Sequence, residues 1–223
     1  MRTTTIHAWM TTIAESVKDQ RDYLTQLDAA IGDGDHGVNM DRGFDAVGKA
    51  LAAQDGAIPP GKLLILAGKT LVSTVGGASG PLWGTAFRRA GRALGDADEF
   101  GGQDLLAALR AALDGVVELG AAQPGDKTMV DALLPFIETL EAAVAAGSPL
   151  PTAWVSAADT AASAAAETAQ LRPQVGRARP LAEKSIGTPD AGAVSMAVCL
   201  RAVGTVLEGT SNDAGQAAGR RRQ

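Results

Sequence analysis

The segment Ile31–Met40, IGDGDHGVNM, contains two aspartates and a histidine among three glycines, and Asp28 lies just upstream. Carboxylates held together at one bend repel one another unless a cation offsets their charge. Carboxylate oxygens suit Mg²⁺, which keeps some of its waters and shares other positions with phosphate oxygens. The glycines allow the bend to turn Asp33 and Asp35 inward. These residues predict a magnesium site formed by Asp28, Asp33 and Asp35.

Other interpretations of this bend are weaker or stay open. Its glycines match the G-x-G-x-x-G pattern of dinucleotide-binding folds, but that pattern requires a preceding strand, and Asp33 and Asp35 would repel a pyrophosphate. A calcium-binding EF-hand loop starting at Asp33 fails because Val38 stands where glycine is required and Phe44 where glutamate is required. A bend of helix-capping residues with solvated carboxylates stays open as an alternative.

A second glycine-rich stretch, VGGASGPLWGTAF at residues 75–87, places small residues and Ser79 ahead of Pro81. Small residues followed by proline are typical of a helix start, where free backbone N–H groups and the helix dipole bind anions. Beside the acidic bend, this stretch predicts the phosphate side of a nucleotide site. The stretch GAIPPGK at residues 56–62 falls short of a Walker A loop, because Leu63 replaces the Ser or Thr and its prolines lack N–H donors.

Apolar residues recur every three or four positions along most of the chain, as amphipathic helices require. We expect eight helices, over residues 6–27, 39–53, 61–75, 81–94, 104–120, 127–147, 152–171 and 192–209. Few stretches alternate as strands do, so the sequence predicts an all-α, single-domain, antiparallel bundle. Asp126 and Lys127 are expected to cap the helix that follows them. The connector 172–191 is too long for a simple bundle loop and is expected to be functional or disordered. Residues 210–223 are expected to form a flexible basic tail.

The composition excludes several classes of protein. The 223 residues carry a formal net charge of −5, which argues against binding to nucleic acid or to an anionic membrane surface. The single cysteine, Cys199, rules out an internal disulfide, and together with the lack of an apolar leader it predicts a cytoplasmic protein. We expect no apolar run of transmembrane length. Cys199 and Trp83 are expected to lie in the core.

Four motifs, LDAAIGDGDHGVNM, GGASGPLWGTAF, PGDKTMVDAL and GRARPLAEKSIGTPDAGA, occur in this order along the chain. Together they resemble the nucleotide-binding L subunit of dihydroxyacetone kinase and the corresponding domain of the single-chain, ATP-dependent enzyme. The resemblance implies an eight-helix barrel over residues 1–209. It also implies that ADP or ATP is bound at one end of the barrel through Mg²⁺, with two ions expected.

The resemblance also implies roles for individual residues. Asp28, Asp33 and Asp35 match the metal-binding aspartates, and Arg177 matches the catalytic arginine near the phosphates. The residues that match nucleotide-contacting positions are His36, Gly37, Val38, Asn39, Ala78, Ser79, Gly120, Met129, Arg177, Asp190, Ala191 and Gly192. The closing segment departs from the family, since Ala191 stands where proline is usual.

In the family the substrate is held by a separate K component. The resemblance therefore implies that this chain transfers a phosphoryl group from bound nucleotide to dihydroxyacetone, or to a related triose or tetrose ketose, on a K partner. A separate L chain resembles the phosphotransferase-linked (PTS) kind, in which bound ADP is recharged by an M-type phosphohistidine protein. Two alternatives stay open: a split ATP-dependent ketose kinase, and a nucleotide-loaded module that docks a transcription regulator.

Overall fold

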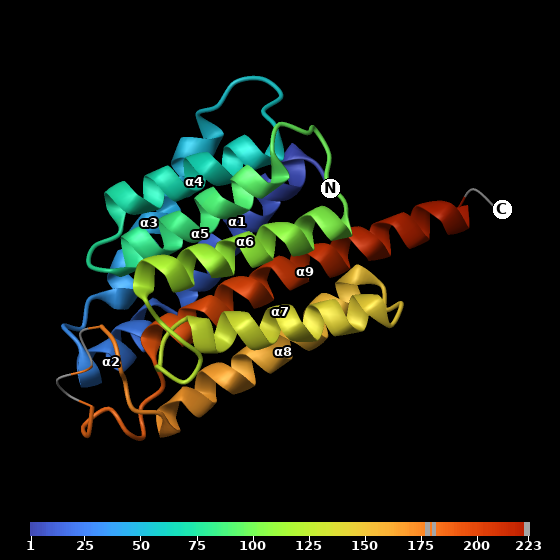
Figure 1. Ribbon diagram of the computed structural model, residues 1–223. Coiled ribbons are helices and arrows are strands. Elements are labelled where there is room, and N and C mark those ends of the chain that lie inside the picture. The colour runs from blue at the N-terminus through green and yellow to red at the C-terminus, as the bar shows by residue number, and fades with distance from the viewer. Residues whose placement is uncertain (177–178, 180–181, 221–223) are drawn as a thin grey trace.

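The computed structural model describes residues 1–176, 179 and 182–220, with side chains except those of residue 31 and residues 210–220. These residues form α-helices and contain no strand, only an isolated bridge between Arg2 and Glu99 (Figure 1). The helices are α1 Thr3–Asp19, α2 Arg21–Ile31, α3 His36–Ala52, α4 Pro60–Thr74, α5 Ser79–Leu94, α6 Gly102–Gly120, α7 Val130–Ala145, α8 Leu150–Glu167 and α9 Ala191–Arg220, with a short 3₁₀ helix, η1, at Thr168–Gln170. The predicted all-α fold is confirmed.

The first predicted helix is divided in two, so the described residues contain nine α-helices instead of eight. Gln20 leaves the helical conformation, with φ −94° and ψ 1°, and separates α1 from α2. Between Val17 and Leu24 no side chain is buried, so nothing anchors a continuous helix to the core. The short helix α2 then leads directly into the acidic bend.

The other eight helices form a closed ring. Each helix packs against the next in the order α1, α3, α4, α5, α6, α7, α8 and α9, and α9 packs against α1. Trp9 and Trp154 stack inside the ring with ring centroids 6.4 Å apart, and Trp83 and Cys199 are buried as predicted. This arrangement is the barrel that the resemblance implied, with α2 added at one end (Figure 1).

Helices α4 and α5 approach each other through glycines. A Cβ atom added to Gly68 of α4 would lie 2.6 Å from the carbonyl oxygen of Gly84 in α5, and one added to Gly84 would lie 2.7 Å from that of Gly68. The two backbones are therefore in direct contact, which no residue with a side chain would allow. This contact fixes the position of α5, whose N-terminus carries the predicted phosphate loop.

Helix α9 is a core element of the barrel. Its residues Ala191–Gly209 have a mean hydropathy of 1.4 and reach transmembrane length, which corrects the expectation that no run does so. Other helices bury 61% of this window, which accounts for its apolar composition. The backbone of residues 210–220 continues α9, where the sequence predicted a separate tail. That this segment is flexible, and that the domain ends at residue 209, stay predictions.

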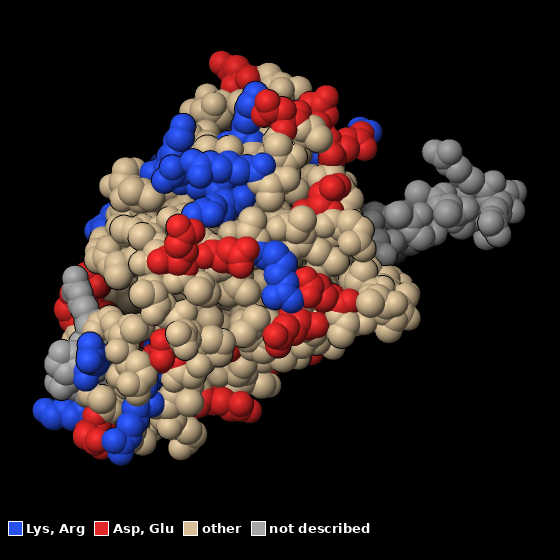
Figure 2. All heavy atoms as spheres, in the orientation of Figure 1, with Lys and Arg blue, Asp and Glu red and all other residues tan. Residues whose placement is uncertain are grey.

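Charges are distributed unevenly over the surface. Figure 2 shows basic side chains gathered over α4 and α5, with acidic side chains and further basic ones spread over the rest of the visible face. Arg88, Arg89 and Arg92 of α5 line a surface groove of about 350 Å³ together with Glu118 of α6, which pairs with Arg89 at 2.5 Å. The net charge of −5 therefore conceals a local basic area, and the absence of nucleic-acid binding stays a prediction.

Candidate functional site

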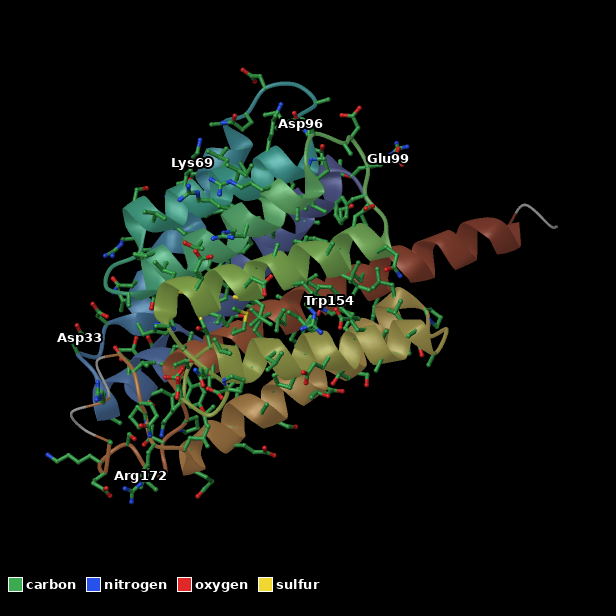
Figure 3. All side chains as sticks on the ribbon, viewed as in Figure 1. Asp33, Lys69, Asp96, Glu99, Trp154 and Arg172 are labelled. Carbon is green, nitrogen blue, oxygen red and sulfur yellow. The ribbon has the colours of Figure 1, made fainter. Side chains whose placement is uncertain are left out.

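Four helices of the barrel, α3, α5, α7 and α9, begin around one cavity at the end where α2 lies. The cavity has a volume of about 490 Å³. Its lining includes most of the residues that the sequence singled out: Asp28, Asp33, Asp35, His36, Ala78, Ser79, Gly120, Met129, Asp190, Ala191 and Gly192. Figure 3 shows Asp33 at this end of the barrel, with Arg172 of the connector nearby, and Asp96 and Glu99 at the opposite end.

The three aspartates of the acidic bend converge. Asp28, Asp33 and Asp35 each offer a carboxylate oxygen, and these atoms all lie within 4.8 Å of one another. Asp28 Oδ2 also accepts the backbone N–H of Asp35 at 2.9 Å and that of His36 at 3.2 Å, which holds the bend against the end of α2. Three oxygen donors of this kind fit a hard divalent cation. Asp33 and Asp35 are solvent-exposed, which leaves room for water or phosphate ligands on such an ion.

The phosphate loop lies on another side of the same cavity. Gly76, Gly77, Ala78 and Ser79 line it just before and at the start of α5. Gly77 has a φ of +63°, a conformation that favours glycine and that turns the chain into the helix. Amide N–H groups in the first turn of a helix lack intrahelical partners and attract anions together with the helix dipole. The cavity therefore pairs a cation site with an anion site.

His36 connects the acidic bend to two other helices. It is 8% exposed, its Nδ1 lies 3.2 Å from Ser79 Oγ of α5, and its Nε2 lies 3.0 Å from Ser195 Oγ of α9. Burial lowers the pKa of His36, and the nearby carboxylates of Asp28 and Asp35 only partly offset this effect. The imidazole ring thus bridges the phosphate loop and α9.

The residues directly after His36 do not line the cavity. Gly37 packs against α2, where an added Cβ would lie 2.8 Å from the Thr25 nitrogen, and Val38 is 48% exposed. Asn39 is buried behind the phosphate loop, and its Oδ1 accepts a hydrogen bond from Arg42 Nη2 at 2.6 Å. Their contact with a nucleotide stays a prediction. Arg177, the predicted catalytic arginine, lies outside the described residues.

Neither Asp126 nor Lys127 caps the following helix as predicted, and Asp126 instead accepts the N–H of Gln123 at 2.7 Å. The N-cap residue of α7, Met129, makes no side-chain cap, and Asp131 in the first turn of the helix accepts the N–H of Thr128 at 2.7 Å. Lys127 is 3% exposed, and its Nζ donates to the carbonyl oxygens of Leu171 at 3.2 Å and Ser185 at 2.7 Å. Burial lowers the pKa of Lys127. The lysine therefore joins Leu171, just before the connector, to Ser185 within it, and residues 175 and 176 of the connector line the cavity. No sequence motif indicated this role for Lys127.

Replacing Lys127 with methionine should loosen the connector. The substitution keeps the approximate length of the side chain but removes the hydrogen bonds from Lys127 to the Leu171 and Ser185 carbonyl oxygens, a loss of about 1 kcal/mol locally. Amide hydrogen exchange of residues 171–188 should therefore become several-fold faster, while α4 and α5 keep their protection. Lys69→Met, which removes an exposed lysine of α4, is the matched control. Unchanged exchange in the connector would contradict the role assigned to Lys127.

Asp190 caps α9. Its Oδ2 accepts the N–H of Ala193 at 2.7 Å, and its own N–H donates to Thr168 Oγ1 at 2.8 Å. Burial raises the pKa of Asp190 from 3.8 to about 7, against the lowering effect of the Ala193 amide. The residue implied to contact nucleotide thus also organises the helix start beside the cavity.

The pKa of Asp190 predicts a pH-dependent stability. Between about pH 4 and pH 7 the folded chain retains a proton that the unfolded chain has lost, so the free energy of unfolding falls as pH rises. The contribution is at most about 1.4 kcal/mol per pH unit. Asp190→Asn keeps a capping oxygen and removes the titration. In urea unfolding measured from pH 4 to 7, the free energy of unfolding of this variant should increase relative to that of the parent as pH rises. A difference that is constant with pH would rule out the raised pKa.

The chain is similar to known proteins over most of its length. A model of the DAK2 domain matches residues 30–205. The chain is 42% identical over 194 residues to the ADP-binding subunit DhaL of the PEP-dependent dihydroxyacetone kinase of Escherichia coli K12, covering 86% of this chain and 91% of that protein. It is 48% identical over 193 residues to D-erythrulose kinase of Mycolicibacterium smegmatis, covering 86% of this chain and 33% of that protein.

A solved structure has the same fold. The dihydroxyacetone kinase of C. freundii, in complex with AMP-PNP and Mg²⁺, matches with a TM-score of 0.71 and 26% identity over 90% of this chain and 33% of that chain. The chain spans about a third of the length of the erythrulose kinases that it matches. Since the DAK2 match covers well over half of the sequence, the resemblance to dihydroxyacetone kinase L subunits is confirmed, and the chain belongs to the DAK2 domain family.

Proposed function

We propose that this chain binds a magnesium–nucleotide complex in the cavity and transfers a phosphoryl group to a hydroxyl of a small ketose. The observation that carries the proposal is the convergence of three carboxylate oxygens within 4.8 Å, in one cavity with the phosphate loop at the start of α5. Dihydroxyacetone and erythrulose are the proposed substrates, because relatives named for both align with most of this chain.

Phosphoryl transfer depends on positioning and on neutralising phosphate charge, and it requires little covalent chemistry from the protein. Asp28, Asp33 and Asp35 are proposed to hold Mg²⁺, with two ions as the expected number. A bound ion would neutralise phosphate oxygens. The amide groups around Ala78 and Ser79 would orient the phosphate chain from the other side. Arg177 stays the proposed catalytic residue that spreads charge in the transition state.

The ketose is proposed to be held on a separate K-type unit, and an M-type phosphohistidine protein of a phosphotransferase system is proposed to recharge bound ADP in the cytoplasm. The relative from Escherichia coli, a PEP-dependent ADP-binding subunit, supports this form by matching over 91% of its length. A second candidate is an ATP-dependent tetrose kinase, which the 48% identity to two erythrulose kinases favours. Docking to a transcription regulator stays an alternative.

Nucleotide retention distinguishes these forms. The purified protein is passed through gel filtration in Mg²⁺, and the bound nucleotide is extracted and identified. One ADP retained per chain indicates a coenzyme that is recharged in place, since a slow dissociation rate is required for retention. Complete loss of ADP, combined with ATP consumption in the presence of erythrulose and a K-type protein, indicates a co-substrate. If neither nucleotide binds in a Mg²⁺-dependent manner, both forms of the proposal fail.

A further inference from the structure

Three segments far apart in the sequence meet at His36. The residue itself begins α3 after the acidic bend, Ser79 begins α5 after the phosphate loop, and Ser195 lies in the first turns of α9. Ser195 is fully buried, at 0% exposed, and does not line the cavity. It therefore reaches the site only through its neighbours. Neither the sequence motifs nor the family resemblance singled it out.

The hydrogen-bonding partners of His36 favour one of its two neutral tautomers. Ser195 Oγ lies 3.0 Å from the carbonyl oxygen of Gly192, which can only accept, and 3.0 Å from His36 Nε2. If the hydroxyl of Ser195 donates to Gly192, its oxygen must accept a proton from Nε2–H. Nδ1 is then unprotonated in the neutral ring and accepts the hydroxyl of Ser79 at 3.2 Å. Of the two neutral tautomers, only this one makes all three contacts hydrogen bonds, since the other leaves Ser195 a single proton for both Gly192 and Nε2.

We propose that Ser195 is a positioning residue: it holds His36 as the Nε2–H tautomer, and His36 in turn fixes the hydroxyl of Ser79 at the start of the phosphate loop. The chain of contacts runs from the Gly192 carbonyl through Ser195 and His36 to Ser79. Because the proton of Ser79 is directed at the imidazole, the loop presents backbone N–H groups as its donors to phosphate. The closing segment at 190–192 and the phosphate loop are therefore linked through one buried ring.

This role resembles that of residues behind a metal ligand, which set the tautomer and orientation of a histidine. Loss of the Ser195 hydroxyl should therefore weaken binding, as loss of such a residue weakens metal binding. Ser195→Ala should weaken binding of Mg²⁺–ADP by about 10-fold, since outer residues of this kind contribute about 10- to 100-fold. Ser195→Thr keeps the hydroxyl and should restore most of the affinity. The consequence for binding rests on the proposed function, whereas the tautomer of His36 does not.

The tautomer is measured directly by long-range ¹H–¹⁵N correlation spectra of the histidine rings in the nucleotide-free protein. The chain has only two histidines, so His36→Asn assigns the signals by removing one set. The parent and Ser195→Thr should show the Nε2–H pattern, and Ser195→Ala should show the Nδ1–H pattern or a mixture of both. A parent spectrum with Nδ1–H, or a Ser195→Ala spectrum identical to the parent's, overturns the proposal even if nucleotide binding is normal.

A double-mutant cycle separates positioning from a general loss of packing. Affinity for Mg²⁺–ADP is measured by calorimetry for Ser195→Ala, His36→Asn and the double variant. If Ser195 acts through His36, its substitution should have no further effect once His36 is replaced. Fully additive losses would show that Ser195 acts independently and would overturn the proposal. Absence of binding by the parent, with the expected tautomer present, would instead refute the proposed function alone.

Discussion

Asp35→Asn should strongly weaken magnesium-dependent nucleotide binding with little change in the fold. The side chain of Asp35 makes no capping hydrogen bond, so the substitution removes one cation ligand and one negative charge. We expect the dissociation constant for Mg²⁺–ADP to rise at least about 100-fold, because residues that only support a metal ligand already contribute about 10- to 100-fold. Isothermal titration calorimetry with ADP, in Mg²⁺ and in EDTA, measures the effect. In EDTA the parent and the variant should be equal.

The choice of aspartate matters for this experiment. Asp28 accepts two backbone N–H groups, so its replacement would disturb the bend as well as the ion. Asp55→Asn is the matched control, since this exposed carboxylate follows α3, whereas Asp35 precedes it. The 17 residues of α3 separate the two positions by about 25 Å. Unchanged affinity in Asp35→Asn, or an equal loss in Asp55→Asn, would refute the metal site at the acidic bend.

Gly68→Ala should strongly destabilise the barrel. The added Cβ would lie 2.6 Å from the Gly84 carbonyl oxygen and 3.0 Å from the Arg88 nitrogen, both backbone atoms of α5. Neither atom can move without displacing the helix, so we expect a loss of about 3 kcal/mol in the free energy of unfolding, the upper end of typical overpacking costs. For a chain of this size, that loss lowers the melting temperature by roughly 6–12 °C. Thermal and urea unfolding measure the change.

Gly48→Ala provides the control for helix propensity. Gly48 lies in the interior of α3 with no atom within 4 Å of an added Cβ. The same substitution there should stabilise the protein by about 0.5–1 kcal/mol, because glycine is the poorer helix former. If Gly68→Ala lowers the free energy of unfolding and Gly48→Ala raises it, then the backbone contact, and not helix propensity, requires glycine at position 68. Equal effects would contradict the close approach of α4 and α5.

The sequence determined the helices and the chemical nature of the site. Apolar side chains at helical spacing mark a face to be buried, and this local signal was sufficient to predict an all-α bundle. The acidic bend and the phosphate loop were also recognisable, because each needs particular residue types within a few positions of one another. The predicted helix starts were less accurate. Helix α3 begins at His36 and α5 at Ser79, which are three and two residues before the predicted positions.

Tertiary structure decided what those residues contact. Lys127 was expected at a helix cap, yet its Nζ reaches carbonyl oxygens 44 and 58 positions further along the chain. Ser195 lies 159 residues from His36, and the barrel closes so that their side chains meet. Local sequence specifies conformation over a few residues, whereas these contacts exist only because α9 packs beside α1 and because Leu171 and Ser185 both lie beside Lys127. The sequence alone therefore determined which chemical groups are available to bind a cation and a phosphate. The closed ring of helices determined which other residues those groups contact.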